Sequence, residues 1–475
     1  MDPNDTEAAD QHRQRVRTLQ ADYFCDDIQP PQESRYWADD TLEAYFQRGG
    51  TLPEILVKLH LPPTKRCRIF TISDIHTDNP KNYSWVQNNL PATAQNAFDV
   101  CICSGDVSDN LDVLRKTLRL LVQRFEVVCF CPGNHDLWVS AAEASTSSIE
   151  KFDRILRLCE EEGVFSRPVR LCTAERNAQN APLDDILLVP LFSWYHESWD
   201  REPASDGDAK ALKLWSDFSR CRWPSSMTTD HARALYFAKR NESFLTTLEQ
   251  TLPPAPMGGR PPPNRVWSKA ETYARYGQQP HTDKLWTSLD AETFFTSRSK
   301  PVRDISLSSH GAHSLVSSRQ KDTRQCDEIE ACPRDDAHRP FVLSYSHFLP
   351  RQELLPERRM LILADLHKVS GSLLLEDQVR RLMPNVHVFG HTHIPMDVTI
   401  EGIRYVQWAL GMPREQTGQT RVVMGFMCLY DGLEFDGEAP QHWCHWTRHY
   451  ELFERDLSRQ ELPYYAKKFR AAMFS

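Results

Sequence analysis

Three short apolar runs near the start of the chain each end in polar residues. They are rich in Val, Ile, Phe and Cys and cover residues 67–76, 98–109 and 125–136. Such runs are typical of buried strands. Between the second and third runs, the segment 111–125 has leucines at helical spacing. Strand, helix and strand at this spacing predict parallel βαβ units, whose polar strand ends meet at the carboxyl edge of one sheet.

The pattern continues in the second half of the chain after an interruption. A helix is expected around 372–384, and a tight turn is expected at YDGL, within the strand-like run 421–435. A half-buried strand is expected over QHWCHWTRHY (441–450), where His and Cys alternate with aromatic residues. The other expected elements are an amphipathic stretch at 141–162, strand-like runs at 186–195, 340–350 and 386–395, and paired strands in 398–413 and 421–435.

A Pro-, Ser- and Arg-rich tract separates the two halves. It opens with LPPAPMGGRPPPNR and has little periodicity, so we expect a long disordered insertion in a surface loop. Before it lies a small aromatic-rich segment that contains helix. The expected organisation is an N-terminal polar and helical extension (1–65), a first domain part that includes the aromatic-rich segment (66–251), the insertion (252–339) and a second domain part (340–475).

Composition narrows the function classes. The 475 residues carry a formal net charge of −9, which disfavours a dedicated nucleic-acid-binding protein. No apolar run approaches the length that spans a bilayer, so no membrane partner is expected. The polar N-terminus has neither a basic nor an apolar region typical of a leader, so we expect no secretory signal, and several of the 13 cysteines lie in the strand-like runs. We therefore expect reduced thiols in a cytoplasmic protein, with the nucleus as the alternative.

Five polar clusters follow the predicted strands. Together they supply carboxylates, imidazoles and one amide without thiolate, a set that suits Mn, Fe, Zn or Mg. Seven candidate ligands exceed the need of one four-coordinate ion and suit two ions that share a carboxylate. Asp106 occupies the middle of the order. In chain order, the clusters are Asp74-x-His76, Gly105-Asp106-x-x-Asp109, Gly133-Asn134-His135-Asp136, His347 and Gly390-His391-x-His393.

The order DxH, GDxxD, GNHD, H and GHTH resembles that of the calcineurin-like metallophosphoesterase superfamily, roughly over 66–195 and 340–435. This resemblance implies an α/β fold, a two-sheet α/β/β/α sandwich with a dinuclear site at the carboxyl ends of the strands. It implies that His135 is the outer-sphere catalytic histidine and that Asp109 orients it. The ligand sets implied by position are Asp74, His76, Asp106 and His393 for one metal, and Asp106, Asn134, His347 and His391 for the other.

The resemblance implies a hydrolase that acts on a phosphomonoester or phosphodiester. A hydroxide between two divalent ions attacks phosphorus, and His135 protonates the leaving group. We expect Mn²⁺ to support activity in vitro. Asn110 after Asp109, and GNHD rather than GNHE, disfavour the serine/threonine protein phosphatases and favour the phosphodiesterase-like members. The expected substrate is a small molecule or nucleotide; the substrate-binding residues stay open.

Two alternatives qualify this interpretation. A second Asp-x-His pair, Asp365 and His367, follows a similar apolar run, but no GD or GNH block follows it. We expect a strand-to-loop junction there instead of a metal site. The second alternative is a catalytically inactive scaffold that keeps the fold and binds partners through its insertion. The presence of all seven ligand types together with His135 favours the enzyme.

Overall fold

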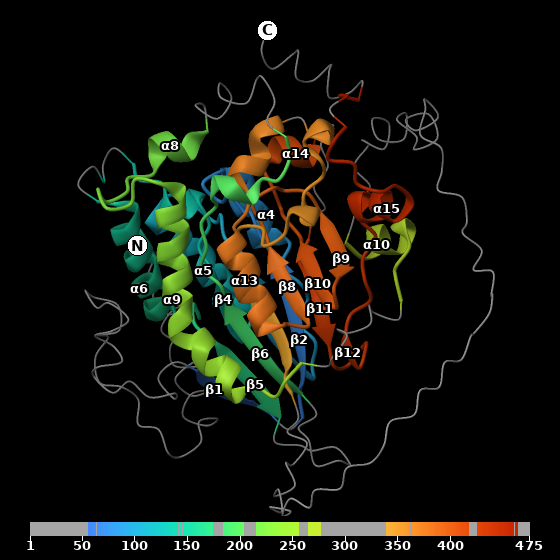
Figure 1. Cartoon of the computed structure of the whole chain (residues 1–475). Coiled ribbons are helices and arrows are strands. Elements are labelled where there is room, and N and C mark those ends of the chain that lie inside the picture. The colour runs from blue at the N-terminus through green and yellow to red at the C-terminus, as the bar shows by residue number, and fades with distance from the viewer. Residues whose placement is uncertain are drawn as a thin grey trace, which may run out of the picture.

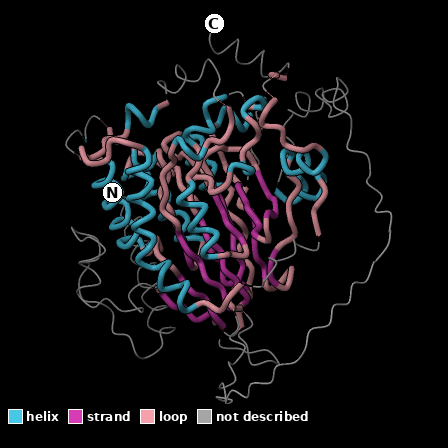
Figure 2. Tube along the Cα trace, viewed as in Figure 1, coloured by secondary structure: helices cyan, strands magenta, loops and turns pink. Residues whose placement is uncertain are grey.

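Two mixed β-sheets pack face to face at the centre of the protein, and helices lie around them (Figures 1 and 2). The computed structural model describes residues 56–62, 64–140, 143, 146–173, 184–203, 215–255, 265–276, 339–361, 363–417, 425–459 and 461–463. Within these residues, no helix combines the length and the apolar character that a bilayer crossing requires.

The larger sheet has seven strands. The β5–β6 and β10–β9 pairs are antiparallel and the remaining neighbours are parallel. Its strands in spatial order are β1 (Val57–Leu61), β5 (Val169–Thr173), β6 (Asp185–Pro190), β7 (Phe341–Tyr345), β8 (Val386–Phe389), β10 (Ile403–Gln407) and β9 (Met396–Ile400).

The smaller sheet has five strands and carries the predicted βαβ units. Strands β2, β3 and β4 are parallel, whereas β11 runs antiparallel to β2. Its order is β12 (Gly437–Glu438), β11 (Met427–Asp431), β2 (Arg66–Ile72), β3 (Ala97–Cys103) and β4 (Val127–Phe130). Cysteines of β3 and β4 are buried and free, and burial raises the pKa of Cys101 and of Cys129. They act there as small core residues.

Helices cover the outer faces because each buries one apolar stripe. In α5 (Leu111–Arg124), Asn110 caps the first turn and the leucines at helical spacing face the core. α9 (Asp230–Thr251) and α13 (Leu373–Leu382) lie side by side in front of the larger sheet (Figure 1). The other helices are α4 (Pro80–Asn88), α6 (Ser148–Glu162), α8 (Ser216–Arg220), α10 (Lys269–Tyr276), α14 (Pro413–Thr417) and α15 (His445–Leu452), with one-turn helices η1 (His135–Leu137), η3 (Glu197–Trp199), η4 (Gln352–Leu354), η5 (Arg358–Met360) and η6 (Ala364–Val369).

The predicted sandwich is confirmed, and four segments differ from their expected form. The expected N-terminal extension (1–65) contains a strand of the larger sheet, β1. This strand forms because its pairing with β5 buries alternate apolar residues. Part of the expected insertion (252–339) is ordered: Trp267 is buried beside His442, and α10 follows it. Residues 256–264 and 277–338 of that insertion lie outside the described part of the chain.

The two remaining differences are helices in place of expected strands. Residues 445–452 form α15, whose buried Trp446 and His449 are three apart and share one helical face. The Asp365–His367 pair lies in η6 and not at a strand end. His367 is buried, with its Nε2 2.8 Å from the carbonyl oxygen of Pro356, and no metal-ligand group of the described residues includes it.

Candidate metal centre

The five polar clusters follow five strand ends, and both sheets contribute. Asp74 and His76 follow β2, Asp106 follows β3 and Asn134 follows β4. From the larger sheet, His347 follows β7, and His391 and His393 follow β8. The carboxyl ends of these parallel strands point the same way. Residues far apart in the sequence therefore meet at the edge where the carboxyl ends of both sheets lie together.

Five of the seven predicted ligands have left-handed backbone conformations. This region is uncommon for residues with a side chain, and such strained residues cluster at functional sites. The tight turns at the strand ends impose it, because each side chain must turn back over the end of its sheet. The φ angles are 50° for Asp74, 46° for His76, 55° for Asp106, 76° for His391 and 56° for His393.

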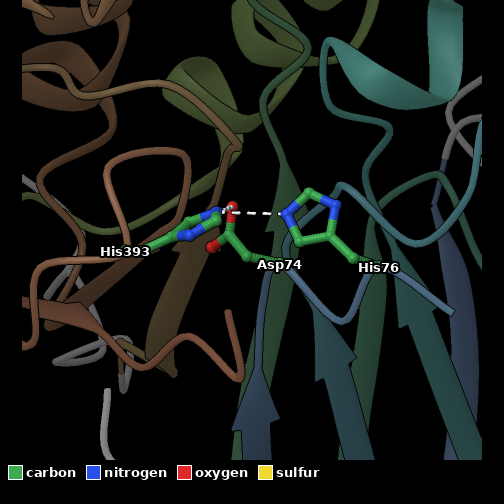
Figure 3. Close-up of side chains that lie close together, drawn as sticks. All are labelled: Asp74, His76 and His393. Carbon is green, nitrogen blue, oxygen red and sulfur yellow. Dashed lines mark hydrogen bonds and ion pairs between the residues drawn. The ribbon is translucent and has the colours of Figure 1, made fainter. Parts of the chain in front are cut away.

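Asp74, His76 and His393 converge on one point, with their polar atoms turned toward one another (Figure 3). The Nε2 atoms of the two histidines lie 3.1 Å apart, and His393 Nε2 lies 3.3 Å from Asp74 Oδ1. Burial alone would raise the pKa of Asp74, but the charge of His393 lowers it to about 2. The carboxylate form is therefore available as a ligand over the physiological pH range.

A second group forms around Asp106, His347 and His391. Asn134 joins it: its Oδ1 lies 3.0 Å from His347 Nε2 and 3.0 Å from His391 Nδ1. His347 Nε2 also lies 3.3 Å from Asp106 Oδ1. Asp106 belongs to a further group with His76 and His135, so it lies between the two ligand sets.

The donor set fits divalent cations. His76 Nε2 and His391 Nδ1 face the other predicted ligands, and the opposite ring nitrogens, His76 Nδ1 and His391 Nε2, have no hydrogen-bond partner among the described residues. Burial lowers the pKa of His76 to about 4 and that of His391 to about 3, which keeps their rings neutral and able to donate lone pairs. Buried carboxylates and imidazoles without thiolate suit Mn, Fe, Zn or Mg.

Neighbouring groups orient the predicted ligands. Glu415 Oε2 lies 2.7 Å from His393 Nδ1, and the carbonyl oxygen of Ser104 lies 2.9 Å from His347 Nδ1. Such contacts fix which ring nitrogen faces a metal. Asp136 accepts backbone N–H groups of Asp106 and Gly133 at 2.9 and 2.8 Å, and so holds the two loops together.

Sequence reasoning assigned no role to Asp136, Glu415 or Asp217. Asp136 stands inside the GNHD block, so its position was a usable signal. Glu415 and Asp217 lie outside the five clusters, and only the folded chain brings them to the site.

His135 lies at the edge of the ligand groups with 22% of its side chain exposed. Its Nε2 lies 3.8 Å from Asp106 Oδ2, and its ring stacks on Trp138 with the ring centroids 3.5 Å apart. Asp109, expected to orient His135, instead forms an ion pair with Arg220 (Oδ2 to Nη2, 3.0 Å). The pairing of Asp109 with His135 stays a prediction.

Sequence comparison confirms the resemblance over the first part of the domain. Residues 67–252 match the family described as calcineurin-like phosphoesterase. That range contains Asp74, His76, Asp106, Asn134 and His135, and the three remaining predicted ligands follow it. Over 140 residues, the chain is 30% identical to the acyl-carrier-protein phosphodiesterase PptH of Mycobacterium tuberculosis, a match that spans 29% of this chain and 40% of the length of that relative.

A crystal structure of the phosphopantetheinyl hydrolase PptH from Mycobacterium tuberculosis aligns with 74% of this chain and 92% of its own, at 18% identity and a TM-score of 0.42.

Proposed function

We propose that this protein is a metal-dependent hydrolase of phosphate esters. Its residues 67–252 match the calcineurin-like phosphoesterase family. The observation that carries the proposal is the convergence of two donor groups, Asp74–His76–His393 and Asp106–His347–His391, which are linked by a third group that contains both His76 and Asp106. Asp74, His76, Asp106 and His393 would hold one divalent ion, and Asp106, Asn134, His347 and His391 the other. Bound ions would supply an activated water and neutralise charge on the phosphoryl oxygens.

The protein's own residues position the reactants. His135 has an exposed edge and lies beside Asp106, so it can reach a leaving-group oxygen and donate a proton from its ring. Its stacking on Trp138 holds the plane of the ring. Glu415 and the Ser104 carbonyl keep His393 and His347 in one orientation. These two proposed ligands are thus held before substrate arrives, which would lower the cost of reorganisation.

A phosphodiester is the substrate class we favour. The 30%-identical relative carries the name of an acyl-carrier-protein phosphodiesterase. A phosphodiester that joins a small group to a carrier protein is therefore the first physiological candidate. A phosphomonoester is the alternative, because both reactions use the same ligand types.

The test uses purified protein reconstituted with Mn²⁺. We expect hydrolysis of bis-p-nitrophenyl phosphate above that of p-nitrophenyl phosphate, two bound ions per chain by metal analysis, and release of the prosthetic group from a phosphopantetheinylated carrier protein. His135→Ala should retain both ions and lose about 100-fold or more in turnover. Fewer than one ion per chain, or no turnover of any phosphate ester by the wild type, would leave the inactive scaffold as the better description.

A further inference from the structure

A buried carboxylate reaches the candidate metal centre from the aromatic-rich segment. Asp217 lies in the short helix α8 and is 2% exposed. Three side-chain N–H groups donate to it. Asn134 Nδ2 and Trp138 Nε1 reach Oδ1 at 2.8 and 2.6 Å, and Trp215 Nε1 reaches Oδ2 at 2.8 Å. A carboxylate satisfies all three donors because both of its oxygens accept hydrogen bonds.

The contact with Asn134 decides which end of its amide faces the other ligands. An amide has a donor end and an acceptor end of nearly the same shape, and only the oxygen coordinates a cation. Asn134 Oδ1 points to His347 Nε2 and His391 Nδ1, at 3.0 Å from each. Its Nδ2 points the opposite way, to Asp217. A carboxylate cannot donate to the amide oxygen, so it opposes the reversed orientation.

We infer that Asp217 is a positioning residue of the metal centre: it holds the Asn134 amide with its oxygen toward the metal and its nitrogen away. The inference rests on the proposed function, since it assigns Asn134 as a ligand. Asp217 touches no reacting atom and acts through Asn134. It belongs to a segment outside all five motif clusters.

The same carboxylate also fixes the ring beside His135. Asp217 holds the indole of Trp138, and that indole stacks on His135 at 3.5 Å between centroids with 28° between the planes. One side chain therefore restrains both a ligand of the metal centre and the support of the proposed proton donor. Loss of Asp217 should disturb metal binding first, because Trp138 keeps its stacking and its contact with Arg220, whose guanidinium carbon lies 4.6 Å from the ring centroid.

The first test measures Mn²⁺ affinity by calorimetry on metal-stripped full-length protein. Asp217→Leu removes both acceptor oxygens at similar bulk. We expect affinity for at least one of the two ions to fall by about tenfold or more. The matched control is Asp184→Leu. Asp184 is a buried carboxylate that accepts from Tyr430 Oη at 2.7 Å and from the backbone N–H of Cys67, near the opposite end of β2. The Asp184→Leu substitution should lower the melting temperature of the metal-stripped protein and leave its Mn²⁺ affinity unchanged.

A charge swap provides a second test that does not depend on the folding of Asp217→Leu. Asn134→Asp alone sets two carboxylates in contact, so we expect weakened Mn²⁺ binding. Adding Asp217→Asn supplies an amide N–H to the new carboxylate and removes the repulsion, with loss of the hydrogen bond from Trp138 Nε1 to Oδ1. The double variant should bind Mn²⁺ about tenfold more tightly than Asn134→Asp alone, a coupling expected only between residues in contact.

The outcomes separate this inference from the proposed function. Wild-type protein that binds no Mn²⁺ overturns both. Wild-type protein that binds two ions, with Asp217→Leu of equal affinity, overturns the positioning role alone. Equal affinities of Asn134→Asp and the double variant overturn it as well, including when Asp217→Leu does not fold.

Discussion

Gly133 is the position at which one added methyl group should disable the site. A Cβ built there would lie 2.2 Å from Asp106 Oδ1 and 2.8 Å from His347 Cδ2. The φ angle of Gly133 lies outside the left-handed region, so alanine meets no strain from φ, although its Cβ would also lie 2.8 Å from the backbone nitrogen of Asp106. The effect of Gly133→Ala is therefore steric, and it acts on the carboxylate that both proposed metals share.

The magnitude follows from the distances. Ordinary van der Waals contact begins near 3.4 Å, and 3.4 − 2.2 leaves a displacement of 1.2 Å for Asp106 or the loop that carries Gly133. Catalytic groups tolerate about 0.5 Å, and a misplacement of about 1 Å costs on the order of 100-fold in rate. Overpacking of this kind also destabilises the fold by about 1–3 kcal/mol.

We expect Gly133→Ala to fold, to lose about 100-fold in kcat/KM on bis-p-nitrophenyl phosphate with Mn²⁺, and to bind Mn²⁺ more weakly. Gly432→Ala is the control. Its Cβ would meet Asp184 Oδ1 at 3.2 Å and Arg66 Cβ at 3.3 Å, away from the site. Wild-type activity and metal content in Gly133→Ala would refute the geometric reasoning.

Three further outcomes are expected. Asp74→Asn should abolish turnover and lower bound Mn²⁺ in metal analysis, whereas Asp365→Asn should retain both; equal loss would reject Asp74 as a specific ligand. Burial lowers the pKa of His387 to about 3 against about 6.5 in the unfolded chain, so stability is full above pH 6.5 and falls as pH drops toward 3. His387→Gln should reduce the slope of unfolding free energy between pH 6 and pH 5 by about 1.4 kcal/mol per pH unit in urea titrations, and an unchanged slope would contradict this assignment. Lys151 is buried and donates to two backbone carbonyls of the site loops. Lys151→Met should therefore lower the free energy of unfolding by about 3 kcal/mol in the same assay. A variant as stable as wild type would show that these contacts contribute nothing.

Strand geometry gathers the motif residues at one edge, and the order of the five clusters along the chain made them recognisable. Apolar runs mark the strands, parallel pairing aligns their carboxyl ends, and residues such as Asp74 and His347 follow directly. The left-handed backbone of Asp74 was not predictable, since no glycine marks it. Neither was the loop held by Asp136, because its four backbone donors become neighbours only after the chain turns.

Alternation and composition misled where tertiary packing decided the form. The segment 441–450 alternates histidine with aromatic residues, yet Trp446 and His449 share the buried face of a helix. Trp267 lies in a proline-rich context, yet it is buried beside His442. Asp217 carries no motif at all, and its three donors come from separate positions along the chain. Local pattern therefore predicts the motif residues better than the groups that contact them.

The contribution of both sheets to the site also determines when its residues become available during synthesis of the chain. His76 and His393 have adjacent Nε2 atoms, but 317 residues separate them in the chain. At a synthesis rate of about 5–20 residues per second, the ribosome adds the second histidine roughly 15–60 s after the first. The early half leaves the ribosome with an incomplete set of donors. Full coordination at the proposed metal centre would therefore require synthesis up to His393, the last of the seven proposed ligands.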